Sequence, residues 1–233
     1  MNLRHPFTWL SESGQKRAFL GVFVFTLATM MSMNIIGHPL VNETAPQGIV
    51  SFEFAGTVDA AHRMMDSWGP QGRISAGLSL GFDYLFLVVY ALCIALGCVL
   101  ISRAMQYRVK IFIPIGAILA WAQFLAAILD AIENFALIRV LFGSTVDLWP
   151  ALARFCAGPK FLIVSAGLLY IIIGLILSFI IKAKRPENNC HPYESGSAGS
   201  PGRSRIGVCR GWESYRLVNQ IWTFLHFLIS TIR

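Results

Sequence analysis

The stretch ISAGLSLGFDYLFLVVYALCIALGCVLI, residues 74–101, decides the fold class of this chain. Its one charged side chain is that of Asp83. A helix of about 20 predominantly apolar residues is long enough to cross the hydrocarbon core of a bilayer. The stretch therefore predicts a membrane-spanning helix that carries a carboxyl group within it.

Three further apolar runs accompany this stretch, at residues 18–36, 111–138 and 161–181. The run 18–36 is longer than a signal-peptide core and no small-residue cleavage site follows it, so we expect a retained span. The composition agrees, because 13% of the residues are charged whereas soluble domains average about 25%. The sequence predicts an all-α integral membrane protein, a four-helix bundle over residues 18–181.

The distribution of lysine and arginine predicts the orientation of the spans. Basic residues are concentrated in the arm 1–17, in the link 102–110 and directly after residue 181. Loops rich in Lys and Arg stay on the cytoplasmic side, so both termini are expected in the cytoplasm and the bundle in the cell membrane. The net charge of +7 follows from these flanks, and anionic lipid headgroups of the bilayer, not nucleic acid, are the expected partners.

The two outer loops differ in length and in their expected structure. In the loop 38–73, Thr57 is a suitable N-cap for a short helix over Val58–Trp68 that ends at Gly69-Pro70. The apolar stripe of this helix fits packing on its own bundle or a lid over a ligand. The second outer loop is expected to run from Phe142 to Pro159.

The tail 182–233 changes in composition. Its first part is rich in Ser, Gly, Pro and Asn and is typical of a linker. Residues 215–233 place apolar side chains on one helical face, which favours a helix at the membrane interface. We expect the whole tail to be cytoplasmic.

Three acidic residues lie inside the apolar runs: Asp83, Asp130 and Glu133. At 1.5 Å per residue, Asp83 and Asp130 lie roughly 15 Å and 13 Å below the outer ends of their runs. An Asp at the centre of a membrane helix costs about 2.5–3.5 kcal/mol, so such groups face a bundle interior or a cavity. We therefore expect a polar site inside the bundle.

Helical spacing groups further polar residues with these acids. Gln123, Asp130 and Asn134 share a stripe with Glu133 beside it. On the neighbouring run, Asp83 shares a stripe with Ala76, Ser79 and Tyr90, and Tyr84 is adjacent. We expect the two stripes to face each other.

Charge and proton sharing complete the predicted site. Asp130 and Glu133 are one turn apart, so in a low dielectric one of them is expected to be protonated or to share a proton with the other. Arg139, Arg73 and His62 are the cations expected nearby. Glu53 lies between two phenylalanines, where it is either solvated in its loop or turned towards the mouth of the bundle.

Several of these motifs resemble a known group of proteins. They are FEFAGT at 52–57, a tryptophan before Gly69-Pro70, GFDYLFLVVYALCIALG at 81–97 and WAQFLAAILDAIENFAL at 121–137. Together they resemble a group of small four-span integral membrane proteins of unknown function. The resemblance covers residues 18–181, leaves out the tail, and implies the four-span fold and its topology without an activity. The matching positions are Glu53, Trp68, Asp83, Tyr84, Tyr90, Asp130, Glu133 and Asn134.

The functional hypothesis rests on the candidate site residues Asp83, Asp130, Glu133, Asn134, Tyr84, Tyr90 and Glu53. One hypothesis is a protein that binds or transports a small amphipathic, lipid-like or cationic ligand, or relays protons, with Asp83 and Asp130 as acceptors. The alternatives are a membrane enzyme with a carboxylic general acid and base acting on a lipid-like substrate, and a structural or accessory subunit. Cysteine and histidine spacings predict neither a metal site nor a cofactor.

Overall fold

The computed structural model describes residues 4–107 and 109–183. It divides into two compact units, Met1–Ser178 and Phe179–Arg233, and the account below concerns the first. All regular secondary structure in the described part of the chain is helical. The linker and the interfacial helix predicted for the tail lie outside the described residues.

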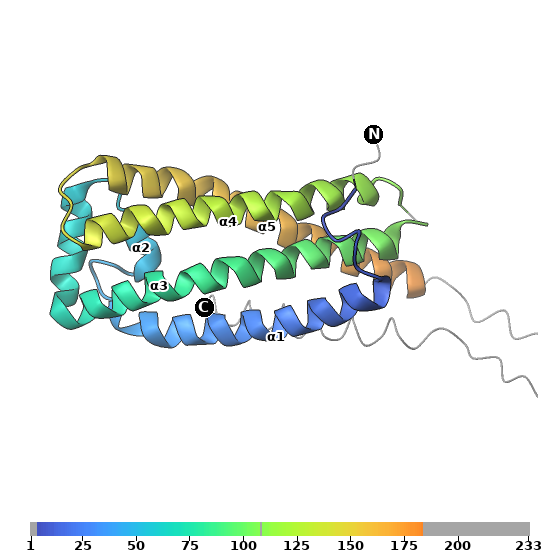
Figure 1. Ribbon diagram of the computed structural model, residues 1–233, viewed down its shortest axis with the longest axis horizontal. Coiled ribbons are helices and arrows are strands. Elements are labelled where there is room, and N and C mark those ends of the chain that lie inside the picture. Colours follow the sequence, from blue (N-terminus) through green and yellow to red (C-terminus); the bar gives the residue numbers. More distant parts are fainter. Residues whose placement is uncertain (1–3, 108, 184–233) are drawn as a thin grey trace, which may run out of the picture. The chain divides into compact units, whose positions relative to one another are not determined.

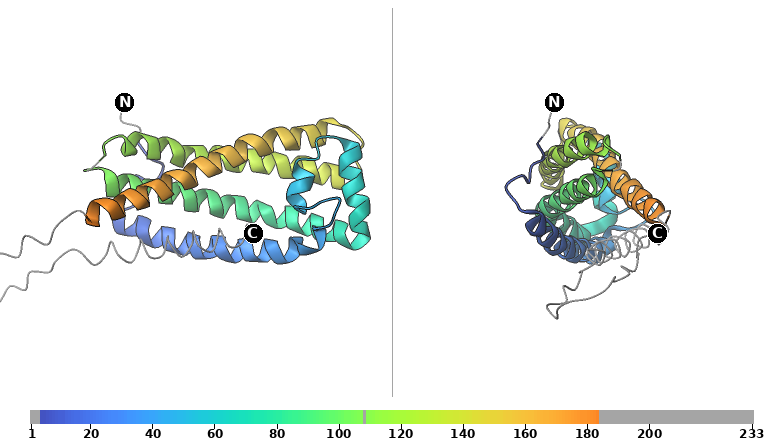
Figure 2. Two further views of the ribbon diagram at one scale, coloured as in Figure 1. Left: turned by 180° about the vertical axis from the view of Figure 1, so that it is seen from behind. Right: turned by 90° about the vertical axis from the view of Figure 1, so that its right-hand side faces the viewer.

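Four helices are long and apolar enough to cross a membrane. They are α1 (Glu12–Gly37), α3 (Val58–Met105), α4 (Phe112–Leu141) and α5 (Leu148–Ala183). Successive long helices run in opposite directions (Figure 1) and lie side by side in both views of Figure 2. The prediction of an all-α chain with four membrane-length helices is confirmed at this level.

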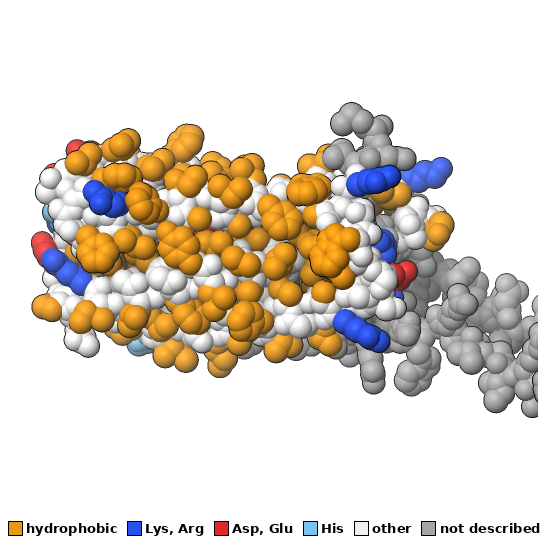
Figure 3. Space-filling model, viewed as in Figure 1, with side chains coloured by type: hydrophobic (Ala, Val, Ile, Leu, Met, Phe, Trp, Pro, Cys, Tyr) orange, Lys and Arg blue, Asp and Glu red, His pale blue; other side chains and the backbone are white. Residues whose placement is uncertain are grey.

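Helix α3 is the innermost of the four. It packs along both α1 and α4. In the apolar 18-residue stretch of α3, 78% of the residues are buried within the protein. The corresponding shares are 22% for α1 and 33% for α4. The other helices therefore turn much of their apolar surface outward, and Figure 3 shows hydrophobic side chains across the middle of one face with Lys and Arg near its two ends.

The first part of α3 is the short helix predicted for the loop. The Thr57 side chain accepts a hydrogen bond from the backbone N–H of Ala60, which satisfies one of the free donors at the start of the helix. At Gly69 the backbone has φ 63°, a conformation that side-chain-bearing residues rarely adopt, and Pro70 begins the long part of α3. This turn sets the segment 58–68 across the ends of the long helices (Figure 1).

The segment before it includes η1 (His38–Leu40) and α2 (Ile49–Glu53), and it buries Leu40 and Phe52 completely. We call residues 38–68 the plug segment. The indole N–H of Trp68 donates to the carbonyl oxygen of Leu40 at 2.8 Å, and the Trp68 ring contacts Phe52 edge-on with centroids 5.4 Å apart. A carboxylate oxygen of Asp147 accepts from the N–H of Val58 at 2.9 Å. These contacts fix α2 over the helix ends.

One predicted boundary at the plug end of the protein needs correction. Helix α5 begins at Leu148, so most of the predicted loop 142–159 is helical. Pro150 lies in the first turn, where proline is tolerated, and Pro159, expected to end the loop, lies inside the helix. As a consequence, Lys160 lies inside the helix and not at its start.

The opposite end of the protein also differs from the prediction. Helix α1 begins at Glu12, capped by Ser11, so the predicted arm 1–17 ends earlier than expected. The remaining arm packs on the protein: Gln15 Nε2 donates to the carbonyl of Phe7 at 2.8 Å, and Trp121 Nε1 to that of Arg4 at 3.1 Å.

Candidate functional site

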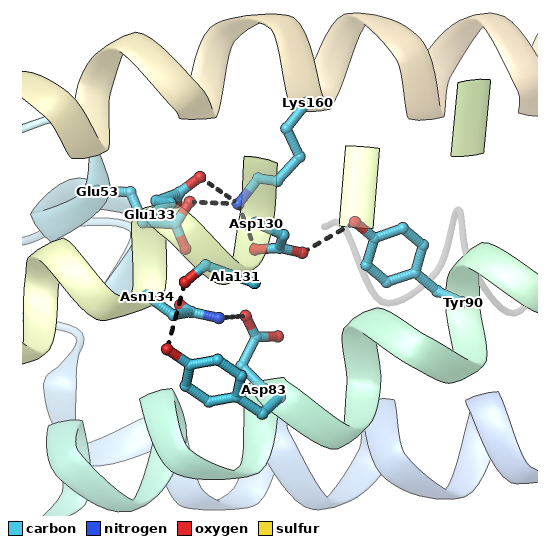
Figure 4. A network of polar contacts seen from close by, with 9 residues as sticks. Glu53, Asp83, Tyr90, Asp130, Ala131, Glu133, Asn134 and Lys160 are labelled. Carbon is cyan, nitrogen blue, oxygen red and sulfur yellow. Dashed lines mark hydrogen bonds and ion pairs between the residues drawn. The ribbon is translucent and has the colours of Figure 1, made fainter. Parts of the chain in front are cut away.

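A lysine that was not among the predicted site residues is at the centre of the polar site. Lys160, on α5, places its Nζ 2.8 Å from Glu133 Oε2 and 3.0 Å from Asp130 Oδ1, both on α4. The same Nζ lies 3.5 Å from Glu53 Oε2, at the end of α2 (Figure 4). The side chains of these four residues are all at most 10% exposed. We call them the acid–lysine cluster.

The cluster holds more acidic than basic groups. Three carboxyl groups face one ammonium group, so full ionisation leaves two negative charges unmatched. In a low-dielectric interior an unmatched charge costs several kcal/mol, and buried groups avoid this cost by taking up protons or by pairing. The geometry therefore sets up a site that is short of positive charge.

Polar groups on α3 extend the cluster. The hydroxyl of Tyr90 donates to Asp130 Oδ2 at 2.9 Å, so that carboxylate is engaged at both oxygens. Asn134 Nδ2 donates to Asp83 Oδ2, which joins α4 to α3 one turn closer to the plug segment. These two contacts join the predicted stripes of α3 and α4, as Figure 4 shows.

Some polar atoms of the site remain without a hydrogen bond. Among the described residues, Glu133 Oε1 and Asn134 Oδ1 are buried and have no hydrogen-bond partner. Glu133 Oε2 lies 2.8 Å from the Lys160 ammonium and forms an ion pair with it. The site thus has free acceptor capacity next to its one cation.

Glu53 joins the cluster because the plug segment is folded. Phe52, the preceding residue, is fully buried against the helix ends, and this packing turns the next side chain inward. Burial raises the pKa of Glu53 above its ordinary value, and the nearby charge of Lys160 opposes this shift. Of the two interpretations of Glu53, the one turned towards the mouth holds.

Tyr84 lies at the edge of the site and not within it. Its side chain is partly exposed, and its hydroxyl donates to the backbone carbonyl of Ala131 at 3.2 Å. In the described contacts, Tyr84 therefore donates to a backbone carbonyl and not to a carboxyl group of the site. Its contact ties α3 to α4 beside the cluster.

The expected cations are engaged elsewhere. Arg73 forms an exposed ion pair with Asp66 at 2.6 Å, and the Arg139 guanidinium lies over the ring of Trp149 at 5.4 Å. No contact in the described part of the chain joins His62 to the carboxyls. Lys160 takes their place. The predicted start of the fourth apolar run, at residue 161, had put this lysine at a membrane boundary.

The described residues hold no group of three or more His, Cys, Asp or Glu side chains arranged to bind a metal ion. Cys93, Cys98 and Cys156 are buried free thiols. The chemistry that the site offers is therefore that of carboxyl, ammonium, amide and phenol groups.

Comparison of the chain with protein-family models, with curated proteins and with solved structures finds no match.

Proposed function

We propose that this chain is a multi-pass membrane protein whose four long helices form a bundle around the acid–lysine cluster, with both termini in the cytoplasm. Supporting this are the lengths of the helices and their outward apolar faces. Basic residues near the end formed by the arm and the link 106–111 support the orientation. The plug segment then faces the outer side.

We further propose that the cluster binds and releases protons, as part of a binding or transport activity. The observation that carries this proposal is the contact of one buried ammonium, Lys160, with three buried carboxyl groups. Intramembrane acids of this kind mark proton and ion pathways in pumps and transporters. A small cationic solute is the class of ligand that the same excess of negative charge would accept in place of a proton.

The contacts suggest how a bound proton acts. When a proton joins Glu133 or Glu53, the ion pair of that carboxyl with Lys160 is lost, and the ammonium shifts towards the remaining carboxylates. Asp130 keeps its bond from Tyr90 in either state. Because the Glu53 contact is the longest of the three at 3.5 Å, it is the ion pair that a proton replaces at the least electrostatic cost.

Infrared spectroscopy of the purified full-length protein in lipid tests the proposal. The carbonyl band of a protonated carboxyl should grow as pH falls, and Glu133→Gln and Asp130→Asn should each remove part of the change. The matched control is Asp66→Asn, whose carboxyl forms an exposed pair with Arg73 and should leave the carboxyl band of buried groups unaltered.

A wild-type spectrum that is independent of pH through the neutral range would reject the proposal. So would cluster variants whose spectra match that of the wild type. A lipid-like product that the wild type forms and Glu133→Gln does not would instead favour the alternative of a membrane enzyme. No contact among the described residues argues for that alternative separately.

A further inference from the structure

Buried polar groups continue from the cluster towards the opposite end of the helices. On α4 the side chain of Gln123 is fully buried, two turns from Asp130 on the same face and roughly 10 Å away along the axis. Farther along, Ser102 of α3 and Tyr170 of α5 are buried against the start of α4. Much of the inner face of α4 between and beyond these groups is alanine and glycine.

The far end of this series is a hydroxyl pair. Ser102 Oγ lies 3.0 Å from the hydroxyl of Tyr170, and both lie close to the carbonyl oxygen of Phe112, at 3.1 Å and 2.7 Å. Two hydrogens serve three contacts, so one contact always lacks a hydrogen and one hydroxyl can accept. A methyl group at Gly116 would collide with both hydroxyls, so only glycine leaves room for the pair.

Gln123 lies between the two ends. Its Nε2 donates to the carbonyl of Ile163 on α5 at 3.2 Å, while its Oε1 is buried without a hydrogen-bond partner among the described residues. A methyl group at Gly167 would come within 2.5 Å of this amide, and the Gly167 carbonyl accepts from Cys98 Sγ at 3.8 Å. The bond from Nε2 alone joins α4 to α5, so the buried oxygen is an acceptor that this helix contact does not need.

We propose that these groups form an internal proton path from the acid–lysine cluster to the Ser102–Tyr170 pair, an inference that rests on the proposed function. The Tyr90 hydroxyl first turns its own hydrogen away from Asp130 towards a water molecule. A proton that has arrived at Asp130 then passes to the Tyr90 oxygen, and the hydrogen that Tyr90 carried leaves to that water. Gln123 is a positioning residue: its Oε1 accepts a hydrogen bond from the water that carries the proton onward. The hydroxyl pair accepts one proton on an oxygen and releases one of its own hydrogens to solvent water at this end of the helices, so a proton enters and a proton leaves with no change of covalent structure.

Proton flux through vesicles tests the path. The full-length protein is reconstituted into liposomes with a trapped pH-sensitive dye, and a potassium gradient with valinomycin sets the membrane potential. Gln123→Met, which keeps the side-chain volume but removes the amide, should lower the flux by about tenfold or more. Tyr170→Phe, which removes a hydroxyl alone, should do the same. Leu125→Met, on the exposed face of α4, is the control.

A second measurement separates this inference from the proposed function. The carboxyl band of the cluster in infrared spectra should respond to pH in Gln123→Met as it does in the wild type. Unchanged flux in both path variants, or proton uptake by a wild type that shows no flux, overturns the path and leaves the proposed function standing. A wild type with neither uptake nor flux overturns both. Restored flux in Gln123→Glu, which retains an acceptor oxygen, would support the positioning role.

Discussion

At the scale of single residues, Lys160 determines whether the buried acids can be tolerated. Its ammonium is the one cationic group in contact with Asp130, Glu133 and Glu53 among the described residues. Removing one partner of a buried ion pair is more costly than replacing the whole pair, because the remaining charge is left without compensation. The lysine therefore has a structural effect that is separable from any role in proton binding.

Lys160→Met is expected to destabilise the protein by about 3–5 kcal/mol. Chemical denaturation of the purified protein in mixed micelles measures this difference. The control is Lys16→Met, which removes an exposed i,i+4 pair with Glu12 and should cost about 0.5 kcal/mol or less. If both variants unfold at the same denaturant concentration as the wild type, the ion pairs of the cluster do not stabilise the fold.

Glu53→Gln is expected to change how stability depends on pH. The pKa of Glu53 is raised in the folded protein, so the folded state holds its proton more tightly than the unfolded state. The resulting stabilisation is complete below the ordinary glutamate pKa of 4.5 and is lost as pH rises through the folded pKa, with a slope of up to about 1.4 kcal/mol per pH unit. Glutamine mimics the protonated form at every pH and removes this slope.

Unfolding of Glu53→Gln and of the wild type over a series of pH values measures the effect. The two proteins should be most alike at low pH and should diverge as pH rises, with the variant the more stable. Glu43→Gln, in the exposed part of the plug segment, is the control and should follow the wild type. Parallel profiles for all three proteins would show that Glu53 is not the titrating group.

Residue-scale prediction from the sequence succeeded where periodicity decides the outcome. Helical spacing placed Asp83, Asp130 and Asn134 on facing stripes, because the cost of exposing polar groups to hydrocarbon leaves one direction for them. It failed for Lys160, since a lysine that follows Gly-Pro also fits the end of a span. The excess of buried acids was the signal that a cation had to come from another helix.

At the scale of elements, the turn at Gly69 holds the plug segment across the helix ends. Its φ of 63° and ψ of −172° belong to a region open almost only to glycine. A local sequence rule predicted this turn and the Thr57 cap. The fold of residues 38–56 could not be predicted in that way, because Leu40 and Phe52 are buried by contacts with distant parts of the chain, among them Trp68.

Gly69→Ala is expected to destabilise the protein by about 1–3 kcal/mol, through backbone strain alone. A methyl group at this position would meet no atom within 4 Å, so steric overlap does not contribute. Gly81→Ala is the matched control: it too has no neighbour within 4 Å but lies in regular helix, where alanine is favoured by roughly 0.8–1.0 kcal/mol. Chemical denaturation should show opposite signs for the two variants, and equal effects would contradict the strain at Gly69.

At the scale of the whole molecule, the proposed membrane orientation follows from how the described helices distribute their surface. The connections 38–57 and 142–147 lie at one end of the first unit, and the arm and the link 106–111 at the other (Figure 1). A bilayer around the apolar faces would separate these two ends completely. Each end must then be accessible from one side of the membrane alone.

Labelling with a membrane-impermeant maleimide tests this separation. Single cysteines are introduced as Thr145→Cys, in the exposed connection between α4 and α5, and Tyr107→Cys, at the exposed end of α3, with Cys190 and Cys209 replaced by serine. Because Lys and Arg hold their flanking loops in the cytoplasm, intact cells should label Thr145→Cys, and Tyr107→Cys should react only after permeabilisation. The buried thiols Cys93, Cys98 and Cys156 should stay unreactive in either case. Labelling of both positions in intact cells would show that no bilayer separates the two ends, and the reverse pattern would place the plug segment and the cluster mouth on the cytoplasmic side.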